Sequence, residues 1–314
     1  MRNELTTTND LMSADLLGKF FLSISDGATA TQRTYKSCLR SFYEWLLNQQ
    51  DGQHPTQDTI QRYKVELQDA GKKPATVHLY MTVVRKFFEF TDNRGCYPNI
   101  AKPIKAGKVN KESTKYYFEP DQVKAIMAKI DDSNEKGLRD KALLDLLFNC
   151  GLRTIEASRA QVKDIVLIGS QYRLLIQGKG HRDKDDDVRL PAQTRAIIMR
   201  YLASRGIDAK QAESCDEPLF TSTTTASKGK AITTRTIRRI CKQAFVNAGF
   251  DDPHFSAHST RHTSAIISLK SNGGNVYKTQ QFLRHKSPAT TEIYTHQLGK
   301  LDNDSADVIA NILH

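Results

Sequence analysis

The sequence predicts a mainly helical protein, with a helical-bundle domain first and then a mixed α/β domain that carries a small antiparallel β-sheet. Three observations support this prediction. Apolar residues recur every three or four positions through most of the chain, a basic stretch without periodicity interrupts them near residue 100, and short alternating runs follow residue 164. A chain of 314 residues is long enough for two domains. We expect the helical domain at 1–97, a linker at 98–115, the mixed domain at 116–299 and a tail helix at 300–314.

The first domain is predicted from amphipathic stripes. Thr31 is a good N-cap residue, and the apolar residues after it fall three or four positions apart, as on one face of a helix. A second helix is expected at 56–70, where Gly71 ends it, and a third after Pro74. With a short helix near 12–24, these segments form a four-helix unit.

Periodicity disappears in "PNIAKPIKAGKVNKESTK", residues 98–115, which holds two prolines and one glycine. A solvated linker is the simplest interpretation of this stretch. A lysine at every third or fourth position of an extended chain can also follow the phosphate backbone of a nucleic acid. The lysines that we expect to make such contacts are Lys102, Lys105, Lys108 and Lys111.

The second domain mixes strands and helices. Its strands are predicted in "DIVLIGSQYRLLIQGKGHRDKDDDVRLP", where Gly169 and Ser170 make the first turn and the charged "GKGHRDKDDD" makes the second. Three short strands joined in this way form an antiparallel sheet. Helices are expected at 119–131, 136–150, 153–160, 191–205, 233–248, 257–271, 275–284 and 287–298.

The composition restricts the partners and the compartment. Lysine and arginine number 46 against 35 acidic residues, and the resulting net charge of +11 suits a polyanionic partner. Five cysteines without a C-x-x-C pair indicate reduced thiols instead of a disulfide framework or a zinc ribbon. No apolar run approaches the roughly 20 residues of a membrane span, and the amino terminus lacks the apolar core of a signal peptide. We therefore expect a cytoplasmic protein with no membrane partner.

Metal binding and anion binding are the alternatives for "PHFSAHSTRHTSA", residues 253–265. His258 and His262 stand four apart, the spacing of a zinc-binding pair on a helix. A zinc-protease helix has glutamate after the first histidine, where this chain has Ser259, and no third ligand follows at a recognisable spacing. His258 and Arg261 instead begin a predicted helix, whose N-terminus favours an anion, and a guanidinium binds phosphate oxygens in a planar fork. We expect no metal here.

Other residues suited to phosphodiester chemistry are scattered along the chain. Such chemistry needs cations for the non-bridging oxygens, a nucleophile and an acid for the leaving oxygen. Arg153 precedes Glu156 in "CGLRTIEASRA", and Lys179 lies in "GKG" at a hairpin turn without the Walker pattern. His285 and Tyr294 follow in "FLRHKSPATTEIYTHQLG". Each residue alone has a simpler explanation, such as a surface ion pair or core packing.

Taken in order, these residues resemble the tyrosine recombinase (phage integrase) family. The resemblance is carried by "GLRTIEA", "GKG", "HSTRHT", "LRH" and "TTEIYTH", and Tyr294 follows Arg261 by 33 positions, which fits the family's spacing. The resemblance covers residues 115–298 approximately, and the motifs that carry it are highly specific. The helical first third is similar to the family's core-DNA-binding domain, mostly by its position in the chain.

The resemblance implies a transesterification on DNA that needs neither a metal nor ATP. Tyr294 would attack the scissile phosphate, form a 3′-phosphotyrosine and release a 5′-hydroxyl. His258 matches the position for proton transfer with the tyrosine, and Lys179 matches the general acid for the leaving 5′ oxygen. Because the covalent link conserves the phosphodiester energy, no cofactor is implied.

The same resemblance assigns the residues around the phosphate. Arg153 and Arg261 would bind the non-bridging oxygens, where negative charge develops. His285 would form a hydrogen bond with the phosphate. Glu156 would support the catalytic residues without itself contacting the phosphate.

Four positions depart from the family's motifs. Ile155 and Ala157 stand where a small residue and a leucine usually flank the glutamate of the first arginine motif. Thr260 stands where leucine is frequent, and Arg284 precedes His285 where glycine is common. None of these changes removes a catalytic group, so we expect them to alter local packing.

The tail "LDNDSADVIANILH", residues 301–314, has an acidic start and an apolar face. It can fold back on its own domain or dock on a neighbouring protomer. In the resembling family such a segment links protomers in a tetramer on two DNA sites, and this is the interpretation that we favour. The apolar residues of this face are Val308, Ile309, Ile312 and Leu313.

The leading hypothesis is a two-domain site-specific recombinase of the Xer or transposon-integrase type, because the length leaves no room for a further arm-binding domain. Its substrate is a double-stranded recombination site in nucleoid DNA or a mobile element, and an accessory protein or a second recombinase is a further candidate partner. A type IB topoisomerase shares the arginine, lysine, histidine and tyrosine roles. A non-catalytic architectural DNA-binding protein and a histidine-helix metalloprotein are the rivals from other classes.

Overall fold

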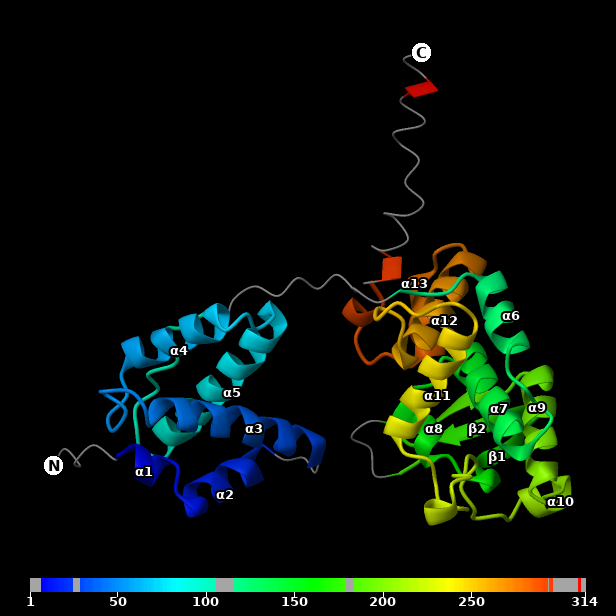
Figure 1. Ribbon diagram of the computed structural model, residues 1–314, viewed down its shortest axis with the longest axis horizontal. Coiled ribbons are helices and arrows are strands. Elements are labelled where there is room, and N and C mark those ends of the chain that lie inside the picture. Colours follow the sequence, from blue (N-terminus) through cyan, green and yellow to red (C-terminus); the bar gives the residue numbers. More distant parts are fainter. Residues whose placement is uncertain are drawn as a thin grey trace. The chain divides into compact units, whose positions relative to one another are not determined.

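The computed structural model describes residues 7–24, 29–105, 116–178, 183–292, 294–295 and 310–311. Two compact units make up the chain, Met1–Lys111 and Glu112–His314. They are coloured blue to cyan and green to red in Figure 1. In the described part of the chain, no helix is both long and apolar enough to cross a membrane.

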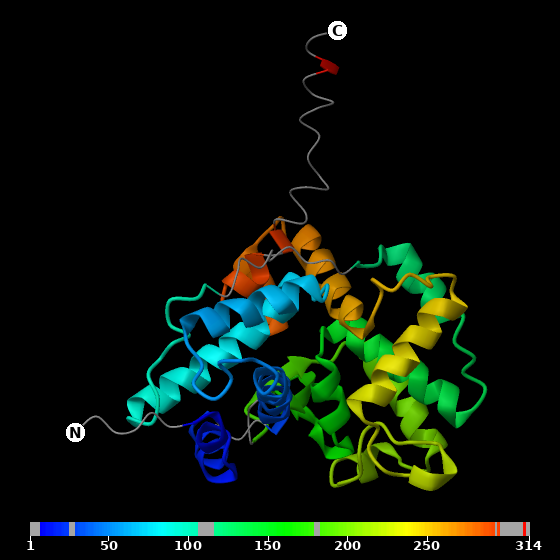
Figure 2. The same cartoon turned by 60° about the vertical axis from the view of Figure 1, so that its left-hand side comes forward.

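The first unit is a bundle of helices. Local residue choices favour the starts of two helices: the Ser13 side chain accepts from the amide of Leu16, and Pro74 occupies the first turn of the longest helix of the bundle, where its missing N–H costs nothing. The helix α5 packs against α3 and α4, and Figure 2 shows α4 and α5 side by side. The helices are α1 (Thr8–Leu11), α2 (Ala14–Ser23), α3 (Thr29–Leu46), α4 (Gln57–Asp69) and α5 (Pro74–Asn93).

Aromatic rings fill the core of this bundle. Phe42 meets the ring of Tyr63 edge-on with centroids 4.9 Å apart, and Phe20 meets Phe87 in the same way at 5.4 Å. Ile104, within the stretch expected to be a linker, is also buried in this core. The packed part of the helical unit therefore extends beyond residue 97.

The second unit contains the predicted antiparallel sheet. Its three strands, β1 (Ile165–Ile168), β2 (Gln171–Ile176) and β3 (Asp186–Arg189), lie in the order β1-β2-β3. Leu174 pairs with Val188 in the centre of the sheet, and both side chains are buried. The predicted fold class, mainly helical with a small antiparallel sheet, is confirmed.

Helices surround this sheet and one of them is central. Four leucines of α7 have no exposed surface, so that this helix is buried on more than one face and packs against α9 and α12. The helices of the unit are α6 (Pro120–Ala128), α7 (Glu135–Cys150), α8 (Thr154–Arg159), α9 (Ala192–Ser204), α10 (Ala209–Ala212), α11 (Thr234–Asn247), α12 (Ala257–Ser271) and α13 (Val276–Leu283), with 3₁₀ turns η1 (Val162–Asp164) and η2 (Thr225–Ser227).

The ends of these helices bring the motif residues together. The helix α7 ends at Gly151, which adopts the left-handed conformation at φ +56°, and the chain then enters α8. The helices α12 and α13 pack against each other, and α12 also packs against α7 (Figure 1). Of the helix predicted at 287–298, residues 287–292 and 294–295 are described: 287 and 288 form a bend and a turn, and 289–292 and 294–295 are helical.

Candidate active site

Arg261 lies in the second turn of α12 and is only 2% exposed. Its Nη1 donates a hydrogen bond to the carbonyl oxygen of Gly151, and its Nη2 donates to that of Leu283. These carbonyls stand at the C-terminal ends of α7 and α13. Because the C-terminus of a helix carries partial negative charge, both ends favour a cation between them. The backbone thus fixes the position of this guanidinium.

The surroundings of Arg261 disfavour its charged form, but the side chain stays protonated at neutral pH. Burial, together with the charges of Arg153 and Arg284, lowers the pKa of Arg261 to about 9, although Glu156 and Tyr294 act in the opposite direction. A group with this pKa is protonated at pH 7. The site therefore concentrates positive charge in a buried place.

Arg153 is held by a buried carboxylate. It is the N-cap residue of α8, its backbone N–H donates to Oε2 of Glu156 at 2.8 Å, and its Nη1 donates to Oε1 at 2.9 Å. The side chain of Glu156 is 1% exposed, whereas that of Arg153 is 33% exposed. The spacing of three residues allows the carboxylate to reach back over the first turn of the helix. One side of the guanidinium is thereby fixed, while the side chain still reaches solvent.

A third arginine shares the same carboxylate. Nη2 of Arg284 lies 3.1 Å from Oε2 of Glu156, and both side chains are buried. Burial acts to raise the pKa of Glu156, but the charge of Arg284 and the hydrogen bonds from Arg153 outweigh it, so that the pKa is lowered. Three guanidinium groups thus surround one ionised carboxylate, and the cluster keeps a net positive charge that suits an anion.

Tyr294 lies beside these charges and is 4% exposed. Its ring stacks on that of His285, with centroids 6.2 Å apart and an angle of 9°, and it meets the ring of His262 edge-on at 5.0 Å. Burial raises the pKa of Tyr294, while Arg261 and Arg153 lower it by a smaller amount. The phenol is therefore protonated at neutral pH and loses its proton only when a base or a developing bond removes it.

Two predicted site histidines, His285 and His258, differ in their exposure. His285 is buried, and its Nδ1 lies 2.8 Å from Oγ1 of Thr291. Burial, followed by the charge of Arg261, lowers the pKa of His285 to about 3, so that this ring is neutral. His258 is exposed in the first turn of α12, and its ring meets that of His262 at 4.7 Å.

The structure thus brings five of the predicted site residues into one cluster and leaves three outside the described residues. Lys179 lies in residues 179–182, which are not described. Lys108 and Lys111 lie in residues 106–115, which are also not described. The described residues contain no group of three or more His, Cys, Asp or Glu side chains that could hold a metal ion. The clustered residues are Arg153, Glu156, Arg261, His285 and Tyr294, with His258 in ring contact through His262.

Two family models match the chain. The phage integrase family matches residues 116–300, and the N-terminal SAM-like domain of phage integrases matches residues 19–95. The chain belongs to the phage integrase family. Relatives of this recombinase include the tyrosine recombinase XerC of Alcanivorax borkumensis, which is 30% identical over 253 residues, or 80% of this chain and 78% of the relative. The tyrosine recombinase XerD of Lacticaseibacillus casei is 28% identical over 285 residues, or 88% and 91% of the two chains.

Solved structures share the fold of the recombinase. The XerH site-specific recombinase, bound to its palindromic difH substrate in a post-cleavage complex, has a TM-score of 0.73 at 20% identity and covers 96% of this chain and 85% of its own. A lambda integrase(75-356) dimer bound to a COC′ core site has a TM-score of 0.69 at 16% identity, covering 92% and 95%. The predicted function, a site-specific recombinase that cleaves and rejoins DNA, is confirmed, and neither the topoisomerase nor the architectural DNA-binding function is favoured.

Two residues of the recombinase site had no role in the sequence motifs. Arg284 stood out only as a departure from glycine, although an arginine at this position adds a positive charge directly beside His285, a predicted site residue. His262 stood out only as the second histidine of a possible zinc-binding pair, and its ring lies against those of both His258 and Tyr294. The sequence could not show that the carbonyl oxygen of Gly151 binds Arg261, because every residue has a backbone carbonyl.

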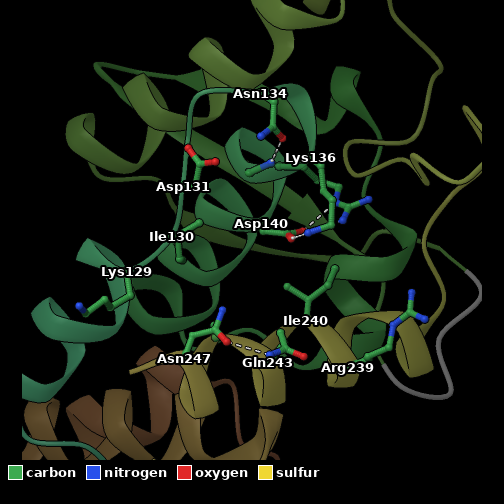
Figure 3. A pocket seen from close by; sticks show the side chains of 13 residues that line it. Lys129, Ile130, Asp131, Asn134, Lys136, Asp140, Arg239, Ile240, Gln243 and Asn247 are labelled. Atoms are coloured by element: carbon green, nitrogen blue, oxygen red, sulfur yellow. Dashed lines mark hydrogen bonds and ion pairs between the residues drawn. The ribbon is translucent and has the colours of Figure 1, made fainter. Parts of the chain in front are cut away.

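The pocket in Figure 3 lies elsewhere on the second unit of the recombinase. It is formed by the end of α6, the start of α7 and one face of α11, and Asp140 on its wall is paired with Arg139 at 2.7 Å. None of the predicted catalytic residues lines it. The residues predicted to be catalytic are instead assembled at the ends of α7, α8, α12 and α13. The residues that line the pocket are Lys129, Ile130, Asp131, Asn134, Lys136, Gly137, Arg139, Asp140, Arg239, Ile240, Gln243, Ala244 and Asn247.

Proposed function

We propose that this recombinase cleaves each DNA strand by attack of the Tyr294 hydroxyl on the scissile phosphate. The bond from Oη to phosphorus forms while the bond from phosphorus to O5′ breaks, which leaves a 3′-phosphotyrosine and a 5′-hydroxyl. Rejoining is the reverse reaction with the 5′-hydroxyl of another strand. One phosphodiester is exchanged for one phosphotyrosine ester, so that the scheme requires neither ATP nor a metal.

The observation that carries this proposal is the arginine cluster beside the buried phenol. Arg153 and Arg261 are both held in place before any substrate binds, by Glu156 and by two backbone carbonyls respectively. Preorganised donors stabilise developing charge without the cost of reorganisation at the moment of reaction. In our scheme they bind the non-bridging oxygens, and their charges also favour the ionised form of Tyr294.

Proton transfer is assigned to groups at the edge of the cluster. His258 is exposed at the start of α12, and its ring is linked to Tyr294 through that of His262, which supports a role in accepting the phenolic proton. His285 is neutral and has its Nδ1 engaged by Thr291, so that Nε2 is the nitrogen left to contact the phosphate. Lys179 supplies the proton for the leaving O5′.

The partner in our proposal is a duplex recombination site, and the working assembly is a tetramer on two such sites. One similar structure is a lambda integrase tetramer bound to a Holliday junction, with a TM-score of 0.66 at 16% identity, over 93% of this chain and 78% of its own. The tail at 300–314 would dock on a neighbouring protomer. Lys102, Lys105, Lys108 and Lys111 would follow the DNA backbone, and an accessory protein or a second recombinase would complete some complexes. The activity would take place on nucleoid or mobile-element DNA in the cytoplasm.

The decisive experiment traps the covalent intermediate. A recognition sequence is first selected from a random duplex library with the Tyr294→Phe protein, and it is then built with a nick next to the cleavage position, so that the released end diffuses away. The wild type should accumulate a protein–DNA adduct that survives denaturing electrophoresis, and Tyr294→Phe should bind the same DNA without forming it. An adduct of equal yield in Tyr294→Phe would show that another residue is the nucleophile.

A further inference from the structure

Arg284 is the only described residue other than glycine with a positive φ. It ends α13 with φ +55° and ψ +49°, in the left-handed region that disfavours residues with a Cβ atom. Elsewhere the described chain uses glycine for this conformation, for example at Gly151 and Gly169. Backbone strain of this kind persists where the surroundings impose it, and such positions cluster at functional sites.

Both terminal nitrogens of the Arg284 guanidinium are engaged, while its buried Nε has no hydrogen-bond partner among the described residues. Nη1 donates to the carbonyl oxygen of Phe282 at 3.0 Å, Nη2 lies 3.1 Å from Oε2 of Glu156, and Nε lies 3.9 Å from Oδ2 of Asp186 at the start of β3. The side chain is 8% exposed. Because both of its terminal nitrogens already have partners, Arg284 is not placed to bind the substrate. Its contact with Glu156 instead connects it to Arg153.

We propose that Arg284 is a positioning residue for the cleavage reaction, which holds Glu156 and, through it, Arg153 in the orientation that binds the scissile phosphate. This inference rests on the proposed function. Oε1 of Glu156 receives Nη1 of Arg153, while Oε2 receives both the backbone N–H of Arg153 and Nη2 of Arg284. With Arg284 removed, Arg153 is the only described residue that still binds the carboxylate, and we expect the two side chains to rotate together.

A purely structural role at the end of the helix is the competing explanation. The backbone N–H of Arg284 donates to carbonyls of the last turn of α13, and glycine makes the same turn with less strain. Glycine at this position therefore keeps the turn and removes the side chain. If the turn alone matters, Arg284→Gly should be as active as the wild type, or more so.

The test compares Arg284→Gly with Arg284→Lys in single-turnover cleavage of the nicked substrate. We expect Arg284→Gly to stay folded at the assay temperature, although the lost buried ion pair with Glu156 lowers its melting temperature, to bind the intact site within about twofold, and to cleave about 10- to 100-fold more slowly, since misplacing one preorganised donor has effects of this size. Arg284→Lys keeps the charge and should recover part of the rate. Lys278→Gln, which removes one exposed charge from the same helix, should cleave within about twofold of the wild type.

A double-mutant cycle connects Arg284 to Glu156. If Arg284 acts through that carboxylate, the rate losses of Arg284→Gly and Glu156→Gln should be strongly non-additive, so that the double variant is little slower than the slower single variant. Additive losses, a wild-type rate in Arg284→Gly, or an equal loss in Lys278→Gln would each overturn the inference. A wild type that forms no adduct would overturn the proposed function and the inference with it, whereas a wild type and an Arg284→Gly protein that cleave equally fast would overturn the inference alone.

Discussion

Arg261 donates a hydrogen bond to the carbonyl oxygen of Gly151, a residue 110 positions earlier in the chain. The contact joins α12 to the left-handed residue that ends α7, and a second bond joins the same guanidinium to Leu283 at the end of α13. Three chain segments therefore meet at one side chain, and the placement of the Arg261 charge depends on how two helices end.

Replacing Arg261 with lysine should separate charge from geometry. An ammonium has no planar fork and cannot span the carbonyls of Gly151 and Leu283 as a guanidinium does. We expect Arg261→Lys to slow single-turnover cleavage at least about 100-fold, because one preorganised donor at developing charge is worth this much. DNA affinity, measured by fluorescence anisotropy, should fall less than about threefold, since this residue contacts one phosphate among many. A folded variant that no longer binds DNA would contradict the assigned role.

Gly151→Ala should destabilise the second unit by more than its backbone conformation alone explains. The new Cβ would lie 2.9 Å from Cδ2 of Leu283 and 3.4 Å from the ring of Phe282, at a φ of +56°. Gly169→Ala is the matched control, because its φ of +61° is similar and no atom lies within 4 Å of the new Cβ. We expect Gly169→Ala to lower the free energy of unfolding by about 1 kcal/mol and Gly151→Ala by about 2–4 kcal/mol, as measured by urea denaturation. Equal losses would show that Leu283 gives way without cost.

The neutral state of His285 should make the fold sensitive to acid. Its pKa is about 3 in the folded protein and 6.5 when exposed, so that below pH 6.5 the unfolded chain takes up a proton that the folded chain does not. This contribution to stability is present above pH 6.5 and is lost as the pH falls toward 3. Between pH 7 and pH 5 the loss amounts to about 2 kcal/mol. Urea denaturation at the two pH values should therefore show a smaller acid loss in His285→Asn than in the wild type, and parallel losses would contradict the shift.

The basic stretch should determine part of the salt dependence of DNA binding. Lys102 and Lys105 lie at the end of the described helical unit, and Lys108 and Lys111 continue the series. Each phosphate contact adds about 0.9 to the slope of log affinity against log salt concentration. Replacing all four lysines with glutamine should therefore reduce that slope by about 3 to 4, and should weaken binding to unrelated duplexes as much as to the recognition site. An unchanged slope would place these lysines away from the DNA.

Residue patterns predicted the helices better than the contacts that join them. The helix expected at 257–271 is α12, Ala257–Ser271, because its capping residue and its spacing are local properties. The four-residue helices α1 and α10 were not expected, since so short a segment shows no periodicity. The burial of Ile104 was hidden because its neighbours are lysines and prolines, and only the packed bundle shows that an apolar side chain there has a core to enter.

The predictions for the site show the same division between local patterns and long-range contacts. The spacing of His258 and Arg261 predicted an anion site at the start of a helix, since side chains three apart share a helix face. The left-handed turn at Arg284 could not be predicted, because the sequence there has arginine where that conformation calls for glycine. Its contact with Glu156 spans 128 positions, a separation at which local patterns carry no information.

The main-chain anchoring of Arg261 also has an evolutionary consequence. A guanidinium bound to a carboxylate side chain restricts which residues can stand at the partner position, whereas a guanidinium bound to carbonyl oxygens restricts only the path of the backbone. Substitutions at position 283 can therefore accumulate without breaking this contact, provided that α13 ends at the same place. Covariation between position 261 and its two partners should be weak among relatives, even though the contacts are essential to the placement of the charge.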